Sequence, residues 1–144
     1  MGGNGSYSHF VAKTLGSYTK DRYKKVDMIG KTKVVVVTQG DMCKTPMNSF
    51  TSKMYYVTKP KHPEKIEHIS FYNQRTHGIS KTIDLEYDKS GNFIGAHTHR
   101  WQVNDKGEYW RKPHDGRNQF EPTKTDWIFI KRALRYNDKH KKQQ

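Results

Sequence analysis

Two histidines one residue apart, His97 and His99, are the residues of this chain whose types and spacing most directly suggest chemistry. On a β-strand, side chains two residues apart point to the same side, with Cα atoms ~6.5 to 7 Å apart at the usual rise. Imidazole titrates near neutral pH, so one ring can accept a proton while the other donates one. Because this spacing can straddle one phosphodiester, we expect His97 and His99 to act as base and acid in RNA cleavage.

The segment before these histidines predicts a β-hairpin that presents a carboxylate beside them. Residues 80–87 and 92–101 are alternating runs, and Asp88 to Gly91 supply turn residues between them. With Tyr87 opposite Asn92, Asp84 lies opposite Gly95, Thr82 opposite His97 and Ser80 opposite His99, all on one polar face. The opposite face receives apolar side chains, which favours this arrangement over a slip of one residue. These apolar residues are Ile83, Leu85, Ile94 and Ala96.

Several neighbours are candidates for supporting roles in this chemistry. Asp84 can orient one imidazole or raise its pKa, Thr82 is a candidate hydrogen-bond donor, and Lys81 is a candidate phosphate cation. Strict alternation places Lys81 and Arg100 on the opposite face, so their participation requires a bulge or a strand end. Trp101 can stack a base or simply pack in the core. The candidate nucleic-acid contacts are Arg100, Trp101, Lys53, Ser52 (or Thr51), Lys131 and Arg135.

Two other interpretations of the histidine pair remain open. His97, His99 and Asp84 together form the two-histidine, one-carboxylate set of non-haem iron sites, and His114 or His77 would extend it to a zinc site. Alternatively, both histidines are structural and the protein only binds nucleic acid. The acid–base reading itself needs no metal or other cofactor.

The surrounding elements predict a single α+β domain. Four consecutive valines within residues 33–39 indicate a strand buried on both faces, and further strands are expected at residues 54–58 and 65–73 and in the hairpin. A helix begins near Lys124, with Thr123 and Asp126 as its cap, and a short helix is expected over residues 11–23. We therefore expect an antiparallel sheet of four to five strands with the C-terminal helix packed on one face. A flexible glycine-rich arm is expected at residues 1–10, the domain at 11–137 and a basic tail at 138–144.

Charge identifies nucleic acid as the leading class of partner. The 144 residues hold 27 Lys and Arg against 14 Asp and Glu, a formal net charge of +13. No run approaches the ~20 apolar residues of a spanning helix, and no signal-peptide core follows Met1. We expect a cytoplasmic protein that is not Sec-exported. Cys43 is the one cysteine, which excludes an internal disulfide and a cysteine-based zinc site.

Several short segments give the chain a resemblance to a known family. The start MGGNGS, the segments PMNSFTSKMYYV, ISFY and KTIDLEYD, and the motif GAHTHRW resemble small proteins encoded among phage and prophage head-morphogenesis genes. These look like the phage branch of the barnase–EndoU–colicin–RelE-like ribonuclease superfamily, whose relatives include polymorphic-toxin nuclease domains. The resemblance covers roughly residues 34–136.

This resemblance implies a function as well as a fold. The fold it implies is a short helical lead, an antiparallel sheet of four or five strands and a packed helix. The implied activity is metal-independent RNA cleavage on the sheet, with Lys81, Asp84, His97 and His99 at matching positions. It also implies a phage-encoded protein in the host bacterial cytoplasm, with a phage or immunity protein as a possible partner. A non-catalytic basic phage accessory protein, binding nucleic acid or a protein, is the alternative.

Overall fold

The structure, a computed structural model, describes residues 23–37, 45, 46, 49, 51–103, 109–111 and 120–141. The expected arm at residues 1–10 and the expected helix at residues 11–22 lie outside these described residues. Tyr23, expected at the end of that helix, instead begins a strand.

The described strands form one sheet in which every strand lies beside its neighbour in sequence. Adjacent strands are antiparallel except β2 and β3, which are parallel. The α+β class is confirmed. The predicted number of four to five strands is too low, because β1 has no alternating apolar pattern from which it could be predicted. The short strand β7, which pairs with β6, is a further strand beyond that number. The strands are β1 (Tyr23–Ile29), β2 (Thr32–Val37), β3 (Met54–Lys59), β4 (His62–Tyr72), β5 (Ile79–Tyr87), β6 (Phe93–Val103) and β7 (Tyr109–Arg111).

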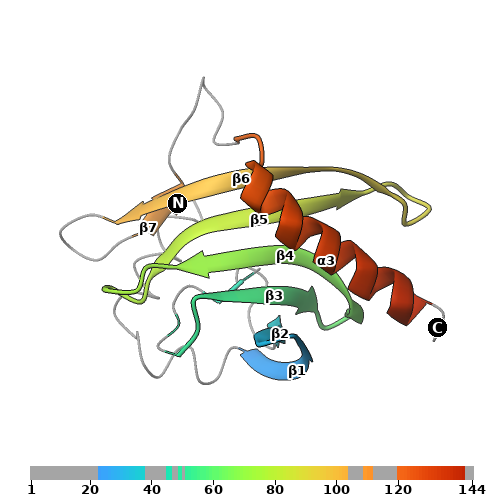
Figure 1. Ribbon diagram of the computed structural model, residues 1–144, viewed down its shortest axis with the longest axis horizontal. Coiled ribbons are helices and arrows are strands. Elements are labelled where there is room, and N and C mark those ends of the chain that lie inside the picture. Colours follow the sequence, from blue (N-terminus) through green and yellow to red (C-terminus); the bar gives the residue numbers. More distant parts are fainter. Residues whose placement is uncertain are drawn as a thin grey trace.

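The helix α3 (Lys124–Lys141) lies diagonally across one face of the sheet (Figure 1). Its first turn has the expected reciprocal cap, since the Asp126 amide donates to Thr123 Oγ1 over 3.1 Å and the Thr123 amide donates to Asp126 Oδ2 over 2.9 Å. Ile130 and Ala133 are fully buried against the sheet and belong to the apolar stripe of this helix. The C-terminal helix on one face is therefore confirmed.

A side-chain amide fixes the second half of α3 to β4. Asn137 Oδ1 accepts the Ile66 amide over 2.7 Å, while Asn137 Nδ2 donates to the Ile66 carbonyl over 3.0 Å and to the Tyr87 hydroxyl over 2.7 Å. This clamp lies at the last residue of the expected domain. The helix continues beyond it through residues 138–141 of the expected basic tail.

Each face of the sheet has its own apolar cluster. The cluster under α3 contains Val34, Tyr56, Ile69, Ile83 and Leu85 among its buried members. On the other face, Val35, Val37, Tyr55, Val57, Tyr72 and Ile79 form a second cluster. The four valines of β2 divide between the two faces and are each at most 6% exposed, so the predicted burial on both faces is confirmed. The two faces of the sheet therefore carry different apolar clusters, and the histidines lie on the face away from α3.

Candidate functional site

The hairpin of β5 and β6 positions the predicted histidines, with a pairing shifted by two residues from expectation. Asp84 lies opposite His97 and Thr82 opposite His99. The loop holds five residues instead of four, and Ile94 is an extra residue in β6, since Phe93 pairs with Tyr87 and Gly95 with Glu86. A shift by two keeps every side chain on its face.

Ile94 itself is an exception to the predicted apolar face. Its side chain is 65% exposed, and Phe93 packs into the cluster under α3 in its place. The prediction for Ile94 is therefore wrong, because a bulge turns the extra residue away from the core.

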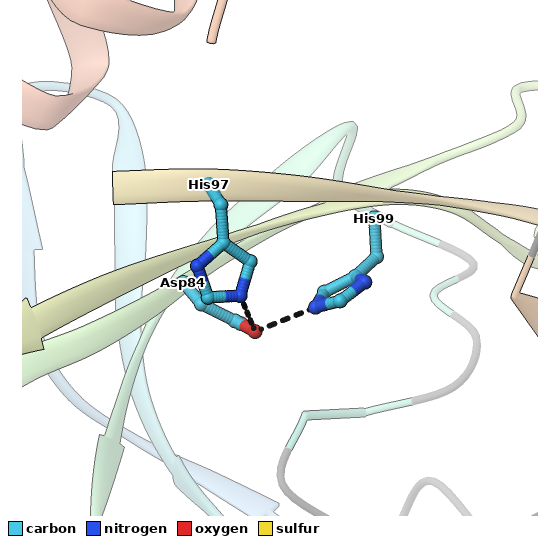
Figure 2. A group of neighbouring side chains, drawn as sticks. All are labelled: Asp84, His97 and His99. Carbon is cyan, nitrogen blue, oxygen red and sulfur yellow. Dashed lines mark ion pairs between the residues drawn. The ribbon is translucent and has the colours of Figure 1, made fainter. Parts of the chain in front are cut away.

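Three imidazoles surround the carboxylate of Asp84. Nε2 of His99 lies 3.0 Å and Nε2 of His97 lies 3.2 Å from Asp84 Oδ2, and both rings descend from the same side of β6 toward this oxygen (Figure 2). Nδ1 of His68, on β4, lies 2.8 Å from Asp84 Oδ1. We call Asp84, His68, His97 and His99 the Asp84 cluster. It gives each carboxylate oxygen at least one imidazole partner.

Sheet pairing explains how His68 joins the cluster. His68, Asp84 and His97 are directly opposite one another on three neighbouring strands. Residues directly opposite on one face of a sheet have adjacent side chains. His68 was not predicted as a site residue, although it lies within a predicted strand, because no residue of β4 indicates which residue of β5 lies opposite it.

The cluster keeps Asp84 ionised. Burial raises the pKa of Asp84, but the hydrogen bonds and positive charge of His68 and His99 outweigh burial and hold the pKa well below its usual range. Asp84 is therefore a carboxylate at neutral pH that accepts from its histidine neighbours.

Access to the cluster is from one side. The side chain of His99 is 3% exposed, whereas those of His97 and Asp84 are each 20% exposed. Glu86, with a side chain 51% exposed, places Oε2 3.2 Å from His97 Nδ1. The rings of His97 and His99 meet edge to face with centroids 4.9 Å apart. His97, Asp84 and Glu86 are therefore accessible from the surface, whereas His99 is buried.

The hairpin places Thr82 near this cluster and Lys81 away from it. Thr82 is buried opposite His99, and its hydroxyl accepts from Trp101 Nε1 over 3.3 Å. Lys81 lies on the α3 face, where its Nζ contacts Asp126 Oδ1 at 2.6 Å. Regular alternation along β5 from Lys81 to Asp84 explains why Lys81 does not reach the imidazoles, since the register shift of β5 against β4 lies before it, at Ser80.

The candidate nucleic-acid contacts are dispersed over both faces. Arg100 is exposed, pairs with Lys81 across the strands and lies over the Phe120 ring at 4.8 Å. Trp101 packs against the apolar cluster of the histidine face, so its body serves as core. The structure does not bring the remaining candidates together at the cluster. Lys53 is exposed and Ser52 half-buried just before β3, while Lys131 and Arg135 are exposed on α3.

The cluster contains a set of atoms able to hold a metal ion. Among the described residues, the ligand atoms of Asp84, His97 and His99 all lie within 4.8 Å of one another. His77, proposed as a further ligand, is not in this group, and His114 lies outside the described residues. The residues therefore match the two-histidine, one-carboxylate set that the sequence suggested.

Comparisons with known proteins leave the family open. No family model, curated protein or solved structure matches the chain. No helix in the part of the chain that the structure describes is both long and apolar enough to cross a membrane. The fold and site define an α+β protein with a histidine–aspartate cluster on the face of its sheet away from α3, and the resemblance to phage ribonucleases remains a prediction.

Proposed function

We propose that the protein binds RNA and cleaves its phosphodiester backbone at the Asp84 cluster. The observation that carries this proposal is the placement of His97 and Glu86, two ionisable side chains in contact at the accessible side of the cluster. They belong to a chain of net charge +13, which attracts a polyanion and raises its local concentration. The resemblance to phage ribonucleases supports the same substrate class.

The geometry supports different tasks for the residues of the cluster and for Glu86 beside it. Cleavage requires groups that take a proton from the 2′-hydroxyl and give one to the leaving 5′ oxygen, together with stabilisation of charge on phosphorus. His97 and Glu86 are placed to contact RNA, because both reach the surface. His99 is buried and acts through Asp84, which also accepts from His68. The pair expected from the sequence, His97 with His99, thus becomes one contact residue and one positioning residue.

The exposed cations support binding of RNA without base readout. Lys53, Arg100, Lys131 and Arg135 lie on different parts of the surface, so they contact phosphates over an extended region and not in one pocket. Binding of this kind weakens steeply as salt rises, because each contact releases counterions from the nucleic acid. The dispersal of these cations also favours the second candidate function, an RNA-binding protein that does not cleave.

A cleavage assay with matched variants tests the proposal. Labelled single-stranded RNA is incubated with the wild type, His97→Ala and His62→Ala, and the products are analysed for a 2′,3′-cyclic phosphate. His62 is an exposed histidine at the start of β4, which makes its replacement a matched control. We expect His97→Ala to reduce the rate at least ~100-fold, as loss of a proton-transfer group does, with the melting temperature retained.

The alternatives predict different results in this assay. Equal cleavage by the wild type and His97→Ala would refute the site. Salt-dependent RNA binding with no cleavage by any protein at low salt would instead support the non-catalytic candidate.

A further inference from the structure

We propose that one divalent transition-metal ion binds at Asp84, His97 and His99. Zinc provides the reference geometry for this site. The binding itself does not depend on the substrate, whereas a catalytic role for the ion rests on the proposed function. The resemblance implies metal-free chemistry, so this inference changes the mechanism that the family pattern predicts.

The convergence of three ligand atoms is the first argument. Nε2 of His97 and Nε2 of His99 lie 3.2 and 3.0 Å from the same oxygen of Asp84. Ligands at the usual ~2.0 to 2.2 Å from zinc in a tetrahedral shell are roughly 3.3 Å apart. Two of the three ligand separations are therefore close to those of a coordination shell, and the third is at most 4.8 Å.

The outer partners of these ligands are the second argument. Glu86 Oε2 lies 3.2 Å from Nδ1 of His97, and Nδ1 of His68 lies 2.8 Å from the other oxygen of Asp84. Metal-binding imidazoles commonly donate their second N–H to a carboxylate, which fixes the tautomer, and metal-binding carboxylates are themselves hydrogen-bonded. Nε2 of His97 and Oδ2 of Asp84 are the atoms left to face an ion.

Proton counting favours the same arrangement. A neutral imidazole has one N–H, so His97 can donate to only one of its two carboxylate neighbours. If His97 Nδ1 donates to Glu86, a metal ion bound between His97 Nε2 and Asp84 would account for the contact that has no proton. Within the described residues, Nε2 of His68 is a buried side-chain nitrogen without a hydrogen-bond partner. The proton of a neutral His68 ring is therefore best placed at Nδ1, where it donates to Asp84.

The chemistry of the three ligands indicates the class of metal. Two imidazoles and one carboxylate suit zinc, iron, cobalt and manganese better than calcium or magnesium, which prefer oxygen ligands alone. His99 anchors the site on its buried side, while His97 and Asp84 are partly exposed. Three protein ligands leave a position for water or a phosphate oxygen, as in catalytic and unlike structural zinc sites.

Metal titration of the whole chain, purified without a histidine tag and stripped with chelator, tests the inference. Zn²⁺ binding is measured by calorimetry, and Co²⁺ binding by visible absorbance, which reports the coordination. We expect one ion per chain, little affinity in His99→Ala or Asp84→Ala, and about 10- to 100-fold weaker binding in Glu86→Ala. Because Glu86 is half-exposed, its variant should fold even where the cluster variants do not. His62→Ala should bind as the wild type does.

The outcomes separate this inference from the proposed function. Absence of a stoichiometric ion would overturn the metal site. Metal binding that is unchanged both in Glu86→Ala and in a folded His99→Ala variant would overturn it as well. RNA cleavage that persists in chelator without bound metal would leave the ribonuclease function and remove the ion from it. Metal binding without RNA cleavage would retain the site and refute the substrate.

Discussion

Replacing Asp84 by asparagine tests whether one carboxylate holds the cluster together. Asparagine has nearly the same shape as aspartate. Its NH₂ group is a donor, however, and would face imidazole N–H groups whose hydrogen bonds the wild-type carboxylate accepts. Three imidazole nitrogens lie 2.8, 3.0 and 3.2 Å from the Asp84 oxygens. Hydrogen bonds to a charged group contribute about 1.5 to 3 kcal/mol each, and their effects within one network are not additive. Since asparagine keeps one acceptor oxygen, we expect Asp84→Asn to lose roughly 2 to 4 kcal/mol of unfolding free energy.

Urea denaturation at neutral pH in chelator measures this loss without a contribution from metal binding. Glu86→Gln is the matched control, because Glu86 contacts His97 from a half-exposed position. Exposed ion pairs contribute about 0 to 1 kcal/mol, so the control should stay within that range. If Asp84→Asn were as stable as the control, the imidazoles would not depend on this carboxylate, and the described cluster would be refuted.

Three further predictions concern the scaffold. Asn137→Ala should lower the unfolding free energy by about 1 to 3 kcal/mol, measured by urea denaturation, because it removes the side-chain acceptor of the Ile66 amide and one of the two side-chain donors to the Ile66 carbonyl. Burial raises the pKa of Tyr87 to about 12 from 10.0, so Tyr87 favours the folded state below pH 10. That contribution disappears between pH 10 and 12, at up to about 1.4 kcal/mol per pH unit, and Tyr87→Phe should flatten this alkaline decline in stability. Lys81→Met should lower the melting temperature, because it isolates buried Asp126, yet leave RNA cleavage by the folded protein unchanged.

The sequence predicted the elements whose signals are local. The valines of β2, the turn at Asp88 and the cap at Thr123 each depend on neighbours in the chain, and each is present in the structure. Asp88 accepts from the amides of Ser90 and Asn92, which closes the loop as the turn chemistry requires. Strand β1 was missed because its residues are mostly exposed and carry no apolar alternation.

The parts of the site that sequence reasoning missed depend on long-range pairing. A histidine on β4 joins the cluster, and a glutamate on β5 contacts it, only through the pairing between strands and the extra residue in β6. The bulge in β6 determines which residues lie opposite one another, and no residue type in the sequence identifies the position of the bulge uniquely. The same limit applies to burial, since His97 and His99 have equivalent positions in the pattern but differ in exposure.

The composition of one row across the sheet supports a functional role for the cluster. Val57, His68, Asp84 and His97 lie side by side on four neighbouring strands, so the row changes from apolar to ionisable at β4. Burying charged groups costs free energy that their attraction repays only in part, and well-packed apolar residues usually stabilise such a position as well or better. Val57 and Tyr72 show that apolar side chains fit this face. The four ionisable side chains of the Asp84 cluster therefore support the proposal of a ligand or reaction that requires them.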